Sequence, residues 1–412
     1  MEPALGLLAS LVVAAGVGVT LAARERSRTI RRLLLVGLVL HVAGGLAYLA
    51  VHESVYGGGD YSVYFAQGTR MADIVVTDGV ETGASYLWGQ YNERLGTAAV
   101  SYLTGWLAVV FGPSMAGLFV LYSVLGFGGV ALACAAFRRS FPDADPRAYY
   151  TWAMLMPSLW FWTSSLGKDA VVMFGVGLVA YGFSLRRPAW GYALMAAGLA
   201  TTFLIRPQYA LVTVVATLFG LTFGRGGIRS PVLRGSAIVV MAVAVVFSFG
   251  FASRALGFDV TDAARVAESV SYRGDATAYG GSAFSAASDP FTGLFNVLFR
   301  PFPWEAPGLA VVVASLEVAV FWALAFRRRR AVAQFVRDHW RTKYGLAAAA
   351  FVVMLGAGVG MAVGNFGTLV RQRVVVYPFL LVAIAGYPFA PRRIGGRPAP
   401  RRRACRRLAA SP

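Results

Sequence analysis

Long apolar runs alternate with short polar breaks along most of the chain. A helix needs about 20 mostly apolar residues to cross a bilayer, and about eleven runs approach that length. The predicted spans cover about 3–22, 32–51, 114–137, 148–163, 169–185, 190–205, 209–224, 236–252, 307–326, 344–363 and 374–390. The pattern predicts an all-α polytopic membrane protein with about 11 transmembrane helices.

Two polar breaks are much longer than the others, at about 52–113 and 253–305. In the first, Tyr61–Met71 and Gly96–Phe111 are predicted to be helices lying along the membrane interface. In the second, Thr261–Val270 is predicted to be a similar helix, with its threonine as N-cap. If 96–111 crossed the membrane instead, every later loop would change sides.

Composition and charge agree with a membrane bundle. Apolar residues make up 57% of the 412 residues and charged residues 14%, whereas soluble domains carry about 25% charge. The net charge of +19 comes from arginines clustered in loops between apolar runs, as expected for cytoplasmic loops. It therefore does not indicate a nucleic-acid partner.

Placing the arginine clusters inside gives an N-terminus outside and a C-terminus in the cytoplasm. Residues 1–391 are then one transmembrane domain, and 392–412 form a basic cytoplasmic tail, expected to be disordered. The Ala-, Arg-, Gly- and Val-rich usage suggests a GC-rich bacterium, so the expected location is a bacterial inner membrane. The long loops 52–113 and 253–305 lie outside in this arrangement.

Cysteine and histidine give no sign of a disulfide framework or a metal site. The two cysteines, Cys134 and Cys405, lie in an apolar run and in the basic tail, and the histidines His41, His52 and His339 are scattered. No metal-ligand spacing occurs, and no cofactor is expected. A divalent metal is compatible with the outer carboxylates but is not indicated.

Asp60 is the first candidate for chemistry, because it follows Gly57-Gly58-Gly59 at the start of the outer loop. Glycines let a ligand approach the backbone closely. A carboxylate on such a loop suits a general base that must reach a substrate hydroxyl. The alternative is a solvated loop aspartate that follows a turn.

A second acid, Asp169, follows Lys168 where an outer turn meets an apolar helix. Charges at that position are costly unless they are paired or used. Asp169 would also lie in the first helical turn, where a carboxylate favours the helix dipole. The pair is therefore either functional or a structural cap.

Four arginines lie on the outer side, against the general trend. They are Arg206, Arg300, Arg371 and Arg373. Arginine holds phosphate with a planar fork, so the set indicates a phosphate-bearing lipid, with snorkelling to headgroups as the alternative. Glu305, in the rigid string after Arg300, would pair with an arginine or touch substrate. Glu317 is a buried carboxylate within a predicted span, which is either functional or paired with another helix.

The order of these features resembles the GT-C superfamily of polyprenyl-phosphate-sugar-dependent glycosyltransferases. The resemblance lies in the outer loop with Asp60, the interfacial helices ending at Phe111-Gly112-Pro113-Ser114, and the later outer Asp169. In that superfamily the first outer loop carries a catalytic acid and the next outer loop a second one. The strings Gly167–Ala170, Ile205–Pro207, Arg300–Glu305 and Gly364–Arg373 also resemble membrane proteins of bacterial exopolysaccharide clusters.

The resemblance implies a GT-C-like fold and an inverting transfer of sugar from a polyprenyl-phosphate donor to a glycan or lipid-linked acceptor. Asp60 and Asp169 would be the catalytic acids. Lys168, the four outer arginines and Glu305 would bind substrate and phosphate, and membrane lipids would surround the protein. The alternatives are a polymerase or ligase acting on lipid-pyrophosphate glycans, a flippase or transporter of lipid-linked glycans, and a non-catalytic scaffold of envelope assembly.

Overall fold

The computed structural model describes residues 3–90, 95–185, 188–256, 284–285, 287–305 and 308–385. This part of the chain is 84% helical and contains no strands. The predicted helix Thr261–Val270, Cys405 and the predicted tail 392–412 lie outside the described residues. The all-α prediction is confirmed for the part of the chain that the structure describes.

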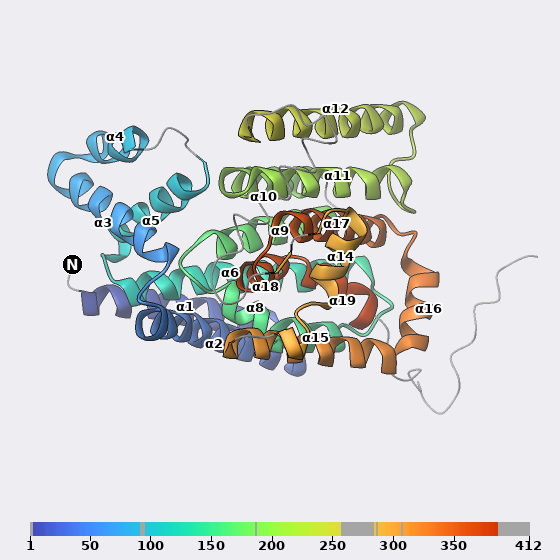
Figure 1. Cartoon of the computed structure of the whole chain (residues 1–412), viewed down its shortest axis with the longest axis horizontal. Coiled ribbons are helices and arrows are strands. Elements are labelled where there is room, and N and C mark those ends of the chain that lie inside the picture. The colour runs from blue at the N-terminus through green and yellow to red at the C-terminus, as the bar shows by residue number, and fades with distance from the viewer. Residues whose placement is uncertain are drawn as a thin grey trace, which may run out of the picture.

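The described elements follow one another as a series of helices (Figure 1). They are α1 (Pro3–Arg24), α2 (Arg28–Val51), the π-helix η1 (His52–Tyr56), α3 (Asp60–Asp78), α4 (Val80–Gln90), α5 (Thr97–Phe111), α6 (Met115–Ser140), α7 (Pro146–Leu155), α8 (Pro157–Trp162), α9 (Lys168–Ser184), α10 (Pro188–Ile205), α11 (Pro207–Phe223), α12 (Pro231–Leu256), α14 (Pro290–Phe299), the 3₁₀ turn η3 (Pro303–Glu305), α15 (Leu309–Arg327), α16 (Arg329–His339), α17 (Lys343–Ala362), α18 (Phe366–Arg373) and α19 (Tyr377–Ala385).

Among the described residues, four helices are long and apolar enough to cross a membrane. They are α1, α2 extended to Val55, α6 and α17; α18 and α19, bent by 64°, make a fifth if they count as one span. Shorter apolar helices of 10–17 residues include α5 and α11. The membrane character predicted from the sequence is supported to this extent.

Two predicted segments take a different form. The predicted span 148–163 is divided into α7 and α8, because Pro157 lacks an amide hydrogen and pushes Met156 into an extended conformation (ψ 117°). The predicted outer turn 365–373 is helix α18, with the Asn365 side chain accepting a hydrogen bond from the Thr368 amide at 3.2 Å.

Glycine faces bring the central helices into close contact. A Cβ on Gly177 of α9 would lie 2.4 Å from the Gly129 oxygen of α6, and a Cβ on Gly175 would lie 2.9 Å from the Gly198 oxygen of α10. Gly360 of α17 meets the Gly293 oxygen of α14 in the same way, at 1.9 Å. The small residues therefore let backbones approach where no larger side chain fits.

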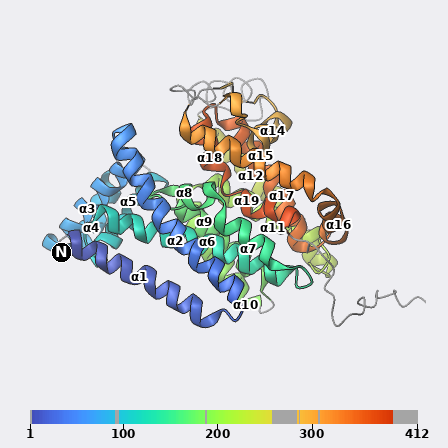
Figure 2. The ribbon, with the colours of Figure 1, turned by 90° about the horizontal axis from the view of Figure 1, so that it is seen from below.

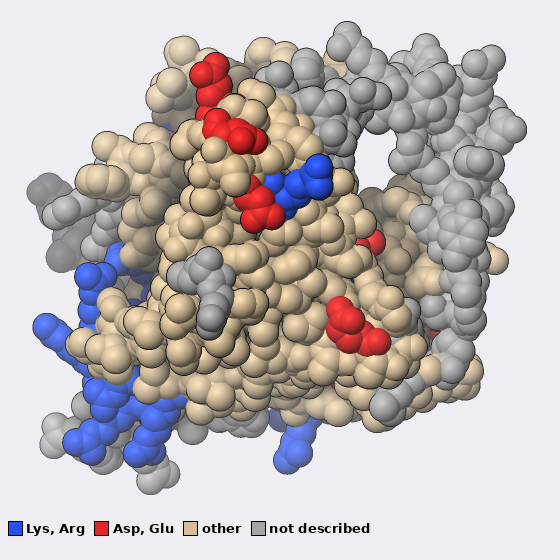
Figure 3. Space-filling model, turned by 90° about the vertical axis from the view of Figure 1, so that its left-hand side faces the viewer, with Lys and Arg blue, Asp and Glu red and all other residues tan. Residues whose placement is uncertain are grey.

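The basic loops lie together at one end of the bundle. Arg138, in the last turn of α6, pairs with Glu25 between α1 and α2, with 2.7 Å between Nη1 and Oε2. The Lys343 ammonium donates to the Phe183 carbonyl at 3.0 Å, which joins the start of α17 to the end of α9. Figure 3 shows one face of the molecule, with most of its visible Lys and Arg gathered at the lower left, apart from most Asp and Glu.

The helices α3–α5 and the helix α16 lie at opposite ends of the molecule. Figures 1 and 2 both show α3–α5 on the left and α16 on the right. The loop after α2 therefore lies at one end of the molecule, and the arginine-rich connections lie at the other end.

Candidate functional site

Asp60 is presented by a glycine turn at the end of α2. Gly57 and Gly58 have φ angles of 69° and 123°, which residues with a Cβ rarely adopt. Gly59 is the N-cap of α3, and Asp60 is the first residue of that helix. Its side chain is 66% exposed. The triple glycine therefore turns the chain so that a carboxylate begins a helix at the surface.

Asp169 is fully buried at the second position of α9, where the sequence predicts a first-turn acid. Arg206 approaches one of its oxygens, with 2.8 Å between Nη2 and Oδ1. Arg371 donates from Nε to the other oxygen, Oδ2. Both oxygens of Asp169 are thus engaged by guanidinium groups, and the carboxylate has no surface open to a substrate.

Arg371 connects the two acids. While its Nε binds Asp169, its Nη1 lies 3.3 Å from Oδ2 of Asp60. The arginine comes from the last turn of α18, 311 positions after Asp60. Its side chain is 19% exposed. The structure thus brings Asp60, Asp169, Arg206 and Arg371 together in one cluster.

Arg206 is fixed in its place by the residues that follow it. It is the N-cap of α11, and Pro207 occupies the first helical position, as proline favours. The guanidinium lies 5.0 Å from the Tyr209 ring centre, and the Tyr209 hydroxyl donates to Gln372 at 3.2 Å. The buried Nη1 of Arg206 has no hydrogen-bond partner among the described residues.

Lys168 supplies a third cation to the cluster. It is the half-buried first residue of α9. A Cβ built on Gly96 would lie 3.6 Å from its Nζ, and the Gly96 amide donates to the Leu204 carbonyl at 2.8 Å. Lys168 forms no ion pair with any residue that the structure describes. Its ammonium is therefore a candidate for binding an anion.

Three helices begin at this cluster. The first residues of α3, α9 and α11 are Asp60, Lys168 and Pro207. A helix N-terminus carries roughly half a positive charge, and its free amides favour phosphate and other anions. Three cationic side chains and three helix ends thus face two carboxylates, one of which is buried and neutralised. The electrostatic balance favours an anion.

Arg300 and Glu305 lie elsewhere and bind each other, as one of the sequence alternatives for Glu305 holds. The Arg300 Nη2 lies 2.6 Å from Glu305 Oε1, and the guanidinium lies 5.0 Å from the Phe366 ring centre. Burial opposes ionisation of Glu305, but hydrogen bonds from Arg300 and from the Phe302 amide hold its pKa below its usual value. Arg300 is therefore committed to a structural pair.

Arg373 has no exposed surface. It donates to the backbone carbonyl of Arg300, and its Nη2 lies 3.5 Å from the Ala314 carbonyl. The prediction that Arg300 and Arg373 bind phosphate therefore does not fit their placement, because one is paired and the other is inaccessible. Arg373 instead ties α18 to the segment after α14 and to α15.

Glu317 is deep in α15 and is paired with another helix. Its Oε2 accepts from the Ser158 amide at 2.9 Å and from the Ser158 hydroxyl at 2.6 Å. These bonds satisfy the start of α8, where the break at Pro157 leaves amides without partners. Of the two predictions made for Glu317, pairing with another helix is the one that agrees with its contacts.

An aromatic group beside the cluster was not singled out from the sequence. His52 stacks on Tyr48, with 3.8 Å between ring centres, and Tyr48 meets Trp162 edge-on at 5.9 Å. The Tyr61 hydroxyl donates to Glu53 at 2.8 Å. The available signal was the density of aromatic residues on both sides of the triple glycine and before Lys168.

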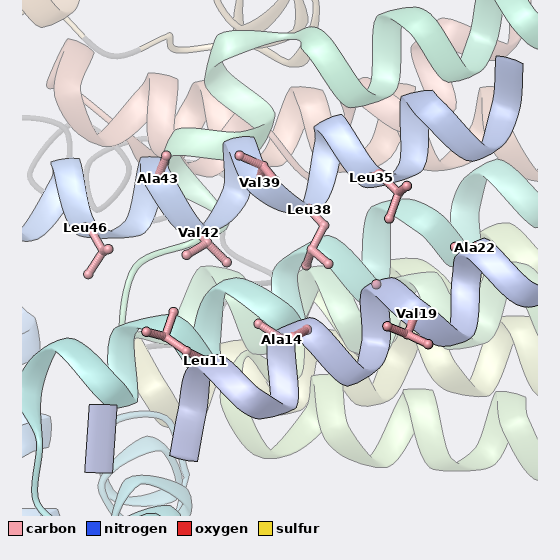
Figure 4. Close-up of a pocket in the computed structure, with 12 residues that line it drawn as sticks. Leu11, Ala14, Val19, Ala22, Leu35, Leu38, Val39, Val42, Ala43 and Leu46 are labelled. Atoms are coloured by element: carbon pink, nitrogen blue, oxygen red, sulfur yellow. The ribbon is translucent and has the colours of Figure 1, made fainter. Parts of the chain in front are cut away.

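The described residues show no group of metal ligands, and an apolar groove lies beside α1. Within the described ranges, no three His, Cys, Asp or Glu residues gather to hold a metal ion. An apolar groove of about 660 Å³ lies between α1 and α2 (Figure 4). Leu11 and Val19 line it from α1, and Leu38 and Val42 line it from α2. It contains no charged side chain.

No family model, curated protein or solved structure matches this chain. Its function is therefore inferred from the residues and their geometry.

Proposed function

We propose that the protein is a membrane glycosyltransferase of GT-C type, which moves a sugar from a polyprenyl-phosphate donor to an acceptor hydroxyl. One observation supports this most directly. An exposed carboxylate, Asp60, touches an arginine that is itself anchored on a buried carboxylate, with two further cations, Lys168 and Arg206, in the same cluster. A base beside an anion site is what this reaction requires.

Asp60 is the general base in this proposal, and Asp169 positions the cations. Asp60 is 66% exposed and contacts one arginine, so an oxygen is free to accept a proton. Asp169 is buried and bound on both oxygens. A carboxylate between two guanidinium groups fixes their direction and lowers the cost of burying them.

The donor phosphate would bind the half-buried Lys168 ammonium, and the positive charges of Arg371 and Arg206, held in place by Asp169, would add to its attraction. The helix starts at α3, α9 and α11 also favour an anion. The donor lipid would enter from the side of the bundle, with its isoprenoid chain among the apolar helices.

The reaction then proceeds by one displacement. The acceptor hydroxyl loses its proton to Asp60 while its oxygen forms a bond to the anomeric carbon. The bond between that carbon and the phosphate oxygen breaks, and its electron pair leaves with the lipid phosphate. Lys168 and the arginines neutralise the departing group. A single displacement inverts the anomeric centre.

The site is assigned to the extracytoplasmic face of a bacterial inner membrane, with about eleven spans, the N-terminus outside and the C-terminus inside. The grouping of basic loops at the opposite end of the bundle supports this orientation, because cytoplasmic loops carry the excess of Lys and Arg.

The test uses protein purified in detergent and polyprenyl-phosphate-linked sugars, with release of polyprenyl phosphate as the readout. Asp60→Asn should reduce release by roughly 10²–10⁴-fold. Asp73→Asn, which changes another exposed aspartate of α3, should leave it unchanged. Asp60→Asn with wild-type turnover would reject the proposed base. Turnover only with lipid-pyrophosphate glycans would favour a polymerase or ligase.

A further inference from the structure

The helix α16 and its flanking residues form the most strongly basic stretch of the described chain outside the site. Residues 327–341 contain six arginines and one acid, Asp338. Arg327, Arg329, Arg330, Arg337 and Arg341 are all exposed. We infer that this surface, the α16 surface, binds the phosphate groups of anionic phospholipids. The inference does not depend on the proposed function.

The helix is held on the bundle by its apolar side. Phe335 is 3% exposed and meets Phe141 edge-on, with 5.1 Å between ring centres. The helix lies crosswise to α15 and α17 at the end of the molecule (Figure 1). Because Phe335 is already buried, the arginines form the face that is left open, and their positions are set by a packed helix.

The open arginines have no internal counter-charge. Arg329, Arg330, Arg337 and Arg341 form no salt bridge with a residue in the described ranges. Phe326 and Trp340, at the two ends of the helix, are 70% and 44% exposed. Basic residues with aromatic neighbours are typical of the membrane interface, where the aromatic ring lies at headgroup level.

The position along the chain favours lipid over an acidic protein. The α16 surface ends beside Lys343, the first residue of α17, which is one of the helices able to span a membrane. A side chain next to the end of a span lies at the depth of the headgroups. Guanidinium groups bind phosphate with paired hydrogen bonds, and each basic residue near an anionic surface contributes about a fivefold preference, or ~1 kcal/mol.

The experiment presents detergent-purified protein with equal amounts of phosphatidylglycerol and phosphatidylcholine and measures retained lipid by native mass spectrometry. The wild type should retain phosphatidylglycerol preferentially. Arg329→Gln/Arg330→Gln/Arg337→Gln should reduce that preference by roughly tenfold or more. The same three positions changed to Lys should keep most of the preference, which separates loss of charge from loss of folding.

A matched control removes the same charge from another basic loop. Arg26→Gln/Arg28→Gln/Arg32→Gln alters three exposed arginines around the start of α2, a stretch with no aromatic neighbour in the sequence, and should reduce the preference by clearly less than the α16 variant does. An equal loss in this control, or an unchanged preference in the α16 variant, would overturn the inference. Stronger retention of polyglutamate than of phosphatidylglycerol, lost in the α16 variant, would assign the surface to an acidic protein instead.

Discussion

Replacing Asp169 by asparagine should unfold the site even though Asp169 contacts no substrate in the proposed reaction. The change leaves Arg206 and Arg371, whose side chains are 11% and 19% exposed, without their shared anion. Removing one partner of a buried ion pair costs about 3–5 kcal/mol. Asp60→Asn breaks only a contact to a 66% exposed carboxylate, which is worth about 0–1 kcal/mol.

The assay measures the thermal midpoint of the purified protein by tryptophan fluorescence at one fixed heating rate. Asp169→Asn should lower the midpoint by roughly 6–10 °C, whereas Asp60→Asn should lower it by less than about 2 °C. Adding Arg206→Gln to Asp169→Asn should cost less than the sum of the two single changes, because the uncompensated charge is removed. Equal midpoints for Asp169→Asn and the wild type would refute the structural role of this carboxylate.

Three further outcomes follow from the contacts. Gly126→Ala should destabilise the protein by about 1–3 kcal/mol, because a Cβ there would lie 1.8 Å from a backbone oxygen of the turn before α9; Gly16→Ala, with open space around it, is the matched control in the same thermal assay. Arg371→Lys should keep the positive charge but lose the guanidinium that contacts both Asp60 and Asp169. Turnover should therefore fall at least about tenfold. Because the Glu305 pKa is held below its usual value, its contribution to stability is present above the unfolded pKa and is lost as pH falls through the folded value. Glu305→Gln should therefore show a smaller fall in midpoint between about pH 6 and pH 3 than the wild type.

Each outcome has a clear opposite. Equal thermal midpoints for Gly126→Ala and Gly16→Ala would mean that α6 and the turn before α9 can move apart without loss of stability. Wild-type turnover of the Arg371→Lys variant would mean that only the positive charge is needed at position 371. A glutamine variant that loses as much stability in acid as the wild type would mean that the pair with Arg300 does not form in solution.

The apolar pattern was sufficient to predict the helical class and the location of several elements. The short polar segment 365–373 was predicted to be an outer turn, because it lies between two apolar runs. The segment is instead the helix α18, and this changes where Arg371 and Arg373 point. Residues two apart on a helix point in different directions, so Arg371 reaches the acids while Arg373 is buried against Arg300 and α15. Spacing alone could not separate the two roles.

Sidedness explains why part of the site was predictable. Arginine clusters follow the orientation of the loops, so Asp60, Asp169 and Arg206 could be assigned to one end from the sequence. The ion-pair partner of each charged residue could not be predicted in this way, because it depends on how far the side chains reach. Glu305, five positions after Arg300, pairs with the guanidinium of that nearby arginine. A hydropathy pattern does not predict this pairing.

The bridge between Asp60 and Arg371 also bears on biosynthesis. The ribosome delivers the acid to the bilayer 311 residues before it delivers the guanidinium. A nascent chain therefore carries Asp60 without its arginine partner until α18 has been made. Under the proposed function, a chain that has not yet made α18 would be unable to consume lipid-linked sugar.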